Sequence, residues 1–192
     1  MTRTVDLGPC EGLLHERDPG RCVVLLPGAH YSTRSPLLWF SRETAQREGW
    51  SVLEVLDEWR ESHEPLEWAR DRAERALSAV SAPSIVVVGK SLASGAANIV
   101  AERWLPAAWL TPLLNRAPVV EALARTRRPT LLVGSRADDT WKSAAIPENP
   151  DLEIVELDGL DHALQVEGDP LASLDALRTV TAVLSEFLRR LP

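Results

Sequence analysis

The chain has 192 residues, of which 45% are apolar and 26% charged, a composition typical of one globular domain with a full core. Its formal net charge of -7 gives no electrostatic support to nucleic-acid binding or to binding at an anionic membrane surface. The first six residues lack the apolar region of a secretion signal, and no apolar run approaches the roughly 18 residues of a membrane span. We therefore expect one domain over residues 1–192, a cytoplasmic location, and two reduced cysteines, Cys10 and Cys22.

Strand and helix patterns alternate from about residue 21 to the end of the chain. Apolar runs predict strands at 22–26, 50–56, 84–88, 107–110, 129–133 and 152–157. Helical periodicity and proline-containing starts predict helices at 36–47, 65–80, 94–104, 117–127 and 170–191. Two weaker strands, 2–7 and 11–17, are expected to form an antiparallel edge. The alternation predicts an α/β fold: a doubly wound, mostly parallel sheet with helices on both faces.

The segment 85–93 is the most informative motif. A run of β-branched residues ends at Gly89, Ser91 follows, and the next small residue is Ala93. This pattern predicts a strand, a tight turn and a helix, with a serine at the tip of the turn. Small residues are needed on either side of such a serine because the strand and helix backbones nearly touch there. Taken alone, Ser91 could also be a helix N-cap.

Three further loops follow predicted strands and carry reactive residues. The loop 27–32 contains His30 and Tyr31, the loop 134–139 contains Asp138 and Asp139, and the loop 158–162 ends at His162. In doubly wound sheets, ligands bind outside the carboxyl ends of the strands, where these loops lie. Serine, acid and histidine thus follow one another in chain order, each after a different strand.

These residue types are what acyl transfer by a serine requires. A histidine must take the serine proton, and a carboxylate must fix the tautomer of the histidine. The oxyanion needs two backbone N–H groups, for which Leu92 and Ala29 are the best candidates, with His30 next. We find no Cys/His spacing typical of a metal site, and the chemistry needs no cofactor.

At this point the sequence resembles the α/β-hydrolase superfamily, and more narrowly its small, lid-less bacterial members related to dienelactone hydrolases. The resemblance extends from about residue 22 to the end and rests on four stretches: LPGA at 26–29, GKSL at 89–92, WLTPLL at 109–114 and DHAL at 161–164. It departs from the family at Ala93, where a glycine is usual. It implies a Ser91–Asp138–His162 triad, because the matching aspartate precedes a tryptophan like Trp141 by three residues.

The same resemblance implies an open site. The superfamily often inserts a lid after the strand that corresponds to 107–110, whereas only residues 111–116 separate that strand from the next predicted helix here. An open site suits small or flexible substrates and gives little burial to long acyl chains. The resemblance leaves the substrate and the oligomeric state undefined.

Several residues keep a second interpretation. Asp139 fits an N-cap for a short helix at 140–145, Asp161 could orient the histidine loop, and His162 could be a solvated loop residue. Lys90 is expected to be solvated, with a functional role at the turn as its second interpretation, and His15 and His63 are expected to lie on the surface. Four residues could line a substrate pocket: His30, Tyr31, Trp109 and Trp141. Three tryptophans are expected on helices and packed on the sheet: Trp39, Trp68 and Trp104.

Two functions of different classes follow. The first is a serine hydrolase that cleaves a carboxylic ester or related acyl bond of a small molecule through an acyl-serine intermediate. The second is a non-catalytic binding or interaction module on the same fold, since a fold does not fix a function. Three reactive groups in three correctly placed loops favour the hydrolase.

Overall fold

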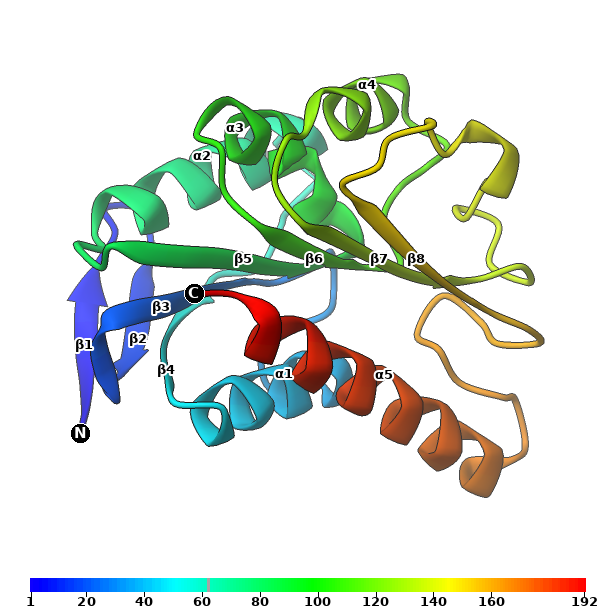
Figure 1. Cartoon of the computed structure of the whole chain (residues 1–192), viewed down its shortest axis with the longest axis horizontal. Coiled ribbons are helices and arrows are strands. Elements are labelled where there is room, and N and C mark those ends of the chain that lie inside the picture. Colours follow the sequence, from blue (N-terminus) through cyan, green and yellow to red (C-terminus); the bar gives the residue numbers. More distant parts are fainter. Residues whose placement is uncertain (62) are drawn as a thin grey trace.

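One eight-stranded sheet runs through the centre of the structure, a computed structural model that describes residues 1–61 and 63–192 (Figure 1). Its strands are β1 (Thr2–Asp6), β2 (Glu11–His15), β3 (Asp18–Leu26), β4 (Trp50–Leu56), β5 (Ser84–Lys90), β6 (Ala107–Leu110), β7 (Thr130–Ser135) and β8 (Leu152–Leu157). Their order is β1-β2-β4-β3-β5-β6-β7-β8. Strand β2 is antiparallel to both its neighbours and all other pairs are parallel, so the predicted fold class and antiparallel edge are confirmed.

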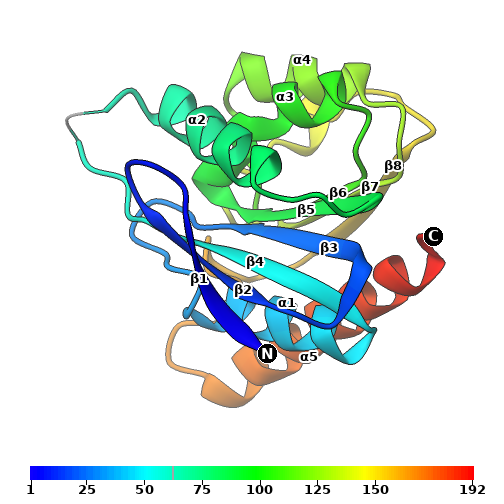
Figure 2. The same ribbon diagram turned by 90° about the vertical axis from the view of Figure 1, so that its left-hand side faces the viewer.

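Helices cover both faces of the sheet. The helices are α1 (Pro36–Arg47), α2 (Pro65–Ser78), α3 (Ala97–Glu102), α4 (Ala117–Arg125) and α5 (Pro170–Arg190). Helices α1 and α5 lie on one face, and α2, α3 and α4 lie on the other (Figures 1 and 2). Side chains alternate along β5, so Val86 and Val88 join the α1/α5 core while Val87 joins the α2–α4 core. Both cysteines are free. Cys22 is buried in the α2–α4 core, and Cys10 packs against the same core.

The longer helices begin where the sequence predicts. Helices α1, α2, α4 and α5 each have a proline in the first turn, where no backbone N–H is needed. The side chains of Glu64 and Asp169 cap α2 and α5 by accepting backbone hydrogen bonds, whereas Ser35 stands at the N-cap of α1 without a side-chain hydrogen bond to the helix. Local capping and proline geometry therefore fix these starts.

The predicted boundaries differ most from the structure at the start of β3 and at the helix after β5. Strand β3 begins at Asp18 rather than at residue 22, because Asp18 pairs with Trp50 across an irregularity in the register. The turn after β5 leads directly into a 3-10 helix, η1 (Ser91–Ala96), and α3 then ends at Glu102. Trp104 follows in a left-handed conformation with φ of 56°, which no α-helix continues through.

Two of the three tryptophans expected to pack on the sheet do not do so. Trp68 is buried, but Trp39 and Trp104 are 39% and 65% exposed. Helix α1 turns Leu37 and Leu38 into the core, and this rotation places Trp39 on the outer side, edge-to-face with Phe40. Residue identity alone did not predict which side of each helix would be covered.

The predicted surface location is wrong for His15. Its side chain is only 12% exposed, and its Nε2 lies 2.6 Å from Oε1 of Glu54, which is itself 1% exposed. Arg42 of α1 donates from Nη1 to the same oxygen at 3.0 Å. This cluster connects β2, β4 and α1, and its members are far apart in the sequence. His63, by contrast, is exposed.

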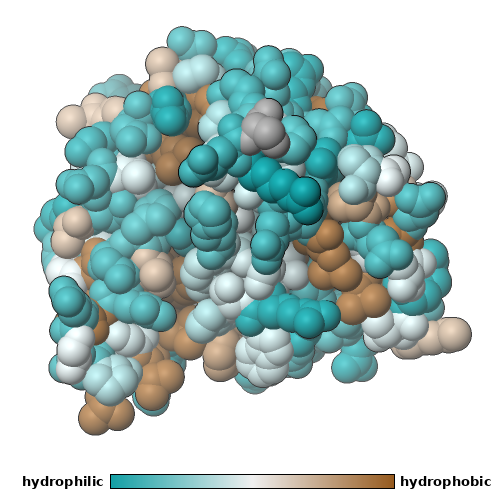
Figure 3. Space-filling model, turned by 180° about the vertical axis from the view of Figure 1, so that it is seen from behind, coloured by the Kyte–Doolittle hydropathy of each residue, from teal (hydrophilic) through white to brown (hydrophobic). Residues whose placement is uncertain are grey.

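Seen from behind, the surface carries hydrophobic residues in several separate patches among hydrophilic ones (Figure 3). In the described ranges, the large exposed hydrophobic residues are Met1, Trp39, Phe40, Trp104, Ile154, Leu171 and Leu174. None of the helices in those ranges combines the length and hydropathy needed to span a membrane.

Candidate active site

The turn after β5 holds Ser91 in a strained backbone conformation. Its φ is 53°, in the left-handed region that residues other than glycine rarely adopt. A Cβ at Gly89 would lie 2.7 Å from the Cβ of Ala93 and 2.9 Å from the Trp109 ring, so only glycine fits there. The methyl group of Ala93 occupies the space above Gly89. Alanine therefore fits at position 93, where the resemblance leads one to expect glycine.

A second serine stabilises this turn and was missed by the sequence analysis. Ser94 is fully buried; its Oγ donates to the carbonyl of Ser91 at 2.7 Å and accepts from the N–H of Leu113 at 3.0 Å. These bonds tie the turn to the segment after β6. The spacing of three residues from Ser91 is the one local signal that could have indicated it.

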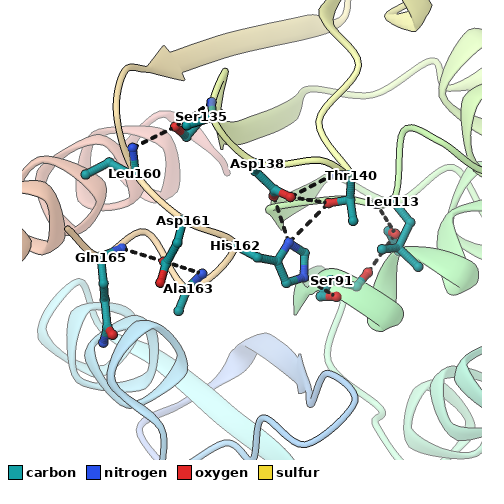
Figure 4. A network of polar contacts seen from close by, with 12 residues as sticks. Ser91, Leu113, Ser135, Asp138, Thr140, Leu160, Asp161, His162, Ala163 and Gln165 are labelled. Atoms are coloured by element: carbon teal, nitrogen blue, oxygen red, sulfur yellow. Dashed lines mark hydrogen bonds and ion pairs between the residues drawn. The ribbon is translucent and has the colours of Figure 1, made fainter. Parts of the chain in front are cut away.

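Ser91, His162 and Asp138 lie in one hydrogen-bonded line (Figure 4). His162 Nε2 is 2.7 Å from Ser91 Oγ, and His162 Nδ1 is 2.7 Å from Asp138 Oδ2. The residues follow the carboxyl ends of β5, β8 and β7, which lie at the same edge of the sheet, with β6 between β5 and β7. The Asp138 side chain is 1% exposed and that of His162 is 36% exposed, so the carboxylate is enclosed while the imidazole reaches the surface.

The two neighbouring aspartates have different surroundings. Asp138 Oδ1 accepts from the N–H and the hydroxyl of Thr140 at 2.8 and 2.9 Å, and Thr140 Oγ1 lies 3.1 Å from His162 Nδ1. Asp139 is exposed. Asp139 was expected to cap a helix at 140–145, and this expectation is wrong. The helix there is the 3-10 helix η2 (Ser143–Ala145), which has Lys142 at its N-cap. Thr140 was missed, although its spacing of two residues is typical of an aspartate turn.

The histidine loop is held by its own polar contacts. Asp161 Oδ1 accepts from the N–H groups of Ala163 and Gln165 at 2.8 and 2.9 Å (Figure 4). Ser135 Oγ, at the end of β7, accepts from the N–H of Leu160 at 3.1 Å. Asp161 therefore orients the loop that carries His162, which is the alternative considered for it from the sequence.

The loop after β3 makes a tight turn beside the end of β5. Gly28 N–H donates to the carbonyl of Tyr31 at 2.9 Å, and His30 has a φ of 52°. A Cβ at Gly28 would lie 3.0 Å from the carbonyl oxygen of Lys90, so the turn approaches the strand closely. Ala29 packs against the apolar cluster that contains Leu92. The two residues expected to donate to an oxyanion thus lie at the same apolar cluster.

His30 and Tyr31, both expected as pocket residues, point to different places. His30 is exposed, lies edge-to-face with Trp59 at 6.1 Å, and lines a hollow of about 600 Å³. Tyr31 is half-buried and its hydroxyl accepts from the N–H of Leu37 at 3.0 Å. Burial raises the pKa of Tyr31.

Lys90 is enclosed rather than solvated, contrary to expectation. The residue is 3% exposed, and its Nζ lies 4.8 Å from the centroid of the Tyr31 ring. Burial lowers the pKa of Lys90 to about 8, against the raising effect of the negative charges on Asp138 and Asp161. A cation of this kind directly precedes Ser91 in the chain.

Trp109 and Trp141 belong to the hydrophobic core rather than to a pocket wall. They are 1% and 3% exposed. Trp109 packs against Gly89 as described, and Trp141 packs so closely on Gly134 that a Cβ there would lie 1.9 Å from its ring. The Trp141 Nε1 donates to Glu156 at 2.6 Å. Both tryptophans therefore pack, from the core side, against the strand ends that carry the loops of the site.

No metal-binding cluster is present in the part of the chain that the structure describes, where no three His, Cys, Asp or Glu side chains are grouped to hold an ion. The polar groups of the site bond to one another instead, as Figure 4 shows. What the arrangement offers chemically is a hydroxyl, an imidazole and a carboxylate in series.

Comparison with known proteins gives a clear answer for the fold. Neither a protein family nor a curated relative matches the sequence. Among solved structures, a dienelactone hydrolase from Anabaena variabilis is similar, with a TM-score of 0.78 and 19% identity over 100% of this chain and 97% of that one. A lid-less α/β serine hydrolase from Xanthomonas campestris has a TM-score of 0.72 and 14% identity over 100% of this chain and 95% of that one. Est1E from Butyrivibrio proteoclasticus has a TM-score of 0.74 and 13% identity over 97% of both chains.

The protein therefore has the α/β-hydrolase fold. Within that class it has the small, lid-less form, as in the Xanthomonas campestris hydrolase, because residues 111–116 alone connect β6 to α4. The resemblance drawn from the sequence is confirmed at the level of the fold.

Proposed function

We propose that the protein is a serine hydrolase that cleaves a carboxylic ester or a related acyl bond of a small molecule. The observation that carries the proposal is the position of His162, whose two ring nitrogens are each 2.7 Å from an oxygen of Ser91 or Asp138. A serine, a histidine and an enclosed carboxylate in this order are what nucleophilic acyl transfer needs.

In the proposed reaction, Ser91 Oγ attacks the substrate carbonyl carbon while His162 Nε2 takes its proton. The tetrahedral intermediate collapses, His162 returns the proton to the leaving group, and an acyl-serine remains. Water then attacks the acyl-serine with His162 as base, and the proton returns to Ser91 Oγ as the acid product leaves. Asp138 accepts from Nδ1 throughout, which fixes the tautomer and stabilises the charged imidazole.

The negative oxygen of the intermediate would be bound by the N–H groups of Leu92 and Ala29. Support comes from the first turn of η1, where the N–H of Leu92 has no partner within the helix, and from the position of Ala29 beside the Leu92 cluster.

A fluorophosphonate probe tests the proposal. The wild-type protein should be labelled at Ser91 and should hydrolyse p-nitrophenyl acetate. Labelling should disappear in Ser91→Ala and fall at least about 100-fold in His162→Ala, because the hydroxyl then lacks its base. A folded wild-type protein that neither labels nor hydrolyses the ester would instead support a non-catalytic binding module.

The choice of acid is tested by a matched pair. Asp138→Asn should lower kcat by about 10³–10⁴-fold, since an amide would favour the wrong histidine tautomer. Asp139→Asn, one residue away on the exposed side, should change kcat less than about twofold. A larger loss in the second variant would reassign the acid.

A further inference from the structure

Lysine is rare in this protein, and its placement is unusual. The chain has 19 arginines but only two lysines, Lys90 and Lys142. Lys142 is exposed, whereas Lys90 is 3% exposed at the end of β5. Burial of an ammonium group is unfavourable unless its surroundings replace the lost water.

The contacts of Lys90 connect the Ser91 turn to the turn formed by Gly28–Tyr31. A Cβ at Gly28 would lie 3.3 Å from Lys90 Cδ, so the lysine stem passes directly along this turn. The ammonium then lies over the ring of Tyr31, 4.8 Å from its centroid. A cation in this position is attracted by the negative face of an aromatic ring, most strongly where water is excluded.

The other charges that face Lys90 act at longer range. Asp138 in the loop after β7 and Asp161 in the loop after β8 both favour its charged form. Within the described residues, neither carboxylate forms an ion pair with it. The acidic side chains are already engaged, Asp138 with His162 and Asp161 with the backbone of its loop. Within residues 1–61 and 63–192, the Tyr31 ring is therefore the one direct partner of the ammonium.

We propose that Lys90 is a positioning residue of the candidate active site: its ammonium holds the Gly28–Tyr31 turn, and with it the N–H of Ala29, against the Ser91 turn. The inference rests on the proposed function for its catalytic consequence. Tyr31 is then part of the scaffold of the oxyanion site rather than a wall that contacts substrate.

Loss of the charge should affect the transition state more than substrate binding. The oxyanion exists only after attack on the carbonyl, so a displaced N–H of Ala29 lowers kcat and leaves KM nearly unchanged. The wild-type activity should also fall on the alkaline side with a midpoint near pH 8, where Lys90 loses its proton to solvent.

The kinetic test compares Lys90→Met with Lys142→Met. Lys90→Met should lower kcat about tenfold with KM within about twofold, matching the loss of a desolvated cation–ring contact. It should also lack the alkaline decline near pH 8. Lys142→Met should behave as the wild type. A wild-type kcat in Lys90→Met, or an unchanged alkaline decline, would overturn the proposal.

Substitutions of Tyr31 separate the ring from the hydroxyl. Tyr31→Phe keeps the ring and loses the bond to Leu37, so it should retain kcat within about threefold, whereas Tyr31→Leu should lose about tenfold. The double variant with Lys90→Met should lose no more than either single variant. Equal losses in Tyr31→Phe and Tyr31→Leu, or losses that multiply, would contradict a role through the ring.

A measurement independent of activity uses the two lysines directly. Protein labelled with ¹³C-lysine should give two side-chain NMR signals, which the variant Lys142→Arg assigns. The Lys90 signal should titrate near pH 8 in the wild type. In Tyr31→Leu its titration midpoint should be lower than in the wild type. Titration at an ordinary lysine pKa in both proteins would refute the contact. Failure of the wild type to label with fluorophosphonate would instead refute the hydrolase proposal and leave this titration interpretable.

Discussion

At the scale of single residues, the site concentrates conformational strain and unfavourable burial. Ser91 occupies a left-handed backbone conformation, which is unfavourable by about 1–3 kcal/mol for a non-glycine residue. Lys90, its neighbour, is an enclosed cation. Such features persist only where surrounding contacts stabilise them, here the bonds of Ser94 and the close packing at Gly89. Their concentration at one turn is itself a sign of function.

The buried charge of Lys90 predicts a specific dependence of stability on pH. A lysine pKa lowered from 10.5 to about 8 means that, between these values, the unfolded chain binds more protons than the folded one. Wild-type stability should therefore rise with pH over this window, relative to Lys90→Met, by up to about 3 kcal/mol. At pH 7 Lys90→Met should be the more stable protein, by a similar amount.

Urea unfolding of both proteins at pH 7, 8, 9 and 10 checks this prediction. The titration of other groups cancels in the difference between the two free energies of unfolding. A variant that is more stable at pH 7 yet less active would separate positioning from general support of the fold. Lower stability of Lys90→Met at pH 7 would contradict the sign derived from burial.

At the scale of elements, strand ends and short turns set the site, and glycines fix how closely the elements approach. The ring of Trp141 fills the space that a side chain on β7 would occupy at Gly134. This contact holds the segment after Asp138 against the sheet. The cluster of Glu54, His15 and Arg42 does the same for the edge strands and α1.

We expect Gly134→Ala to destabilise the protein by about 1–3 kcal/mol, because its methyl group would overlap the Trp141 ring. The same substitution in a Trp141→Leu background should be less unfavourable, since the smaller side chain leaves room. Thermal or urea unfolding of the four proteins measures the coupling. An equal effect in both backgrounds would indicate that the overlap is not the cause.

At the scale of the whole molecule, the fold lacks a lid over the site. The connection from β6 to α4 is residues 111–116, and the His162 side chain is 36% exposed. An acyl chain attached at Ser91 would therefore remain partly in water. Enclosure of a chain would contribute about 0.8 kcal/mol per methylene, or about fourfold in kcat/KM, which an open site cannot supply.

We accordingly expect kcat/KM for p-nitrophenyl esters to change less than about twofold per added methylene from acetate upward. Initial rates on a series from C2 to C10, with Ser91→Ala as the background, measure this. A steady increase of about fourfold per methylene would show that an apolar channel encloses the chain.

The sequence by itself determined the order of strands and helices and the loops that carry Ser91, Asp138 and His162. These features depend on local physics: side-chain periodicity, proline at helix starts, and small residues at a tight turn. The oxyanion candidates Ala29 and Leu92 were predicted from their positions in loops that follow predicted strands. The sequence therefore predicted the α/β-hydrolase fold and the loops where a site could form.

Only the tertiary structure decided the surroundings of each side chain. It placed Asp138 rather than Asp139 against His162, enclosed Lys90 against the Tyr31 ring, buried Trp109 and Trp141, and half-buried His15 against Glu54. These outcomes depend on contacts between residues distant in the chain, which no local pattern encodes. Burial and electrostatics are properties of neighbours in space, and neighbours in space are fixed only when the sheet, the helices and the loops have packed together.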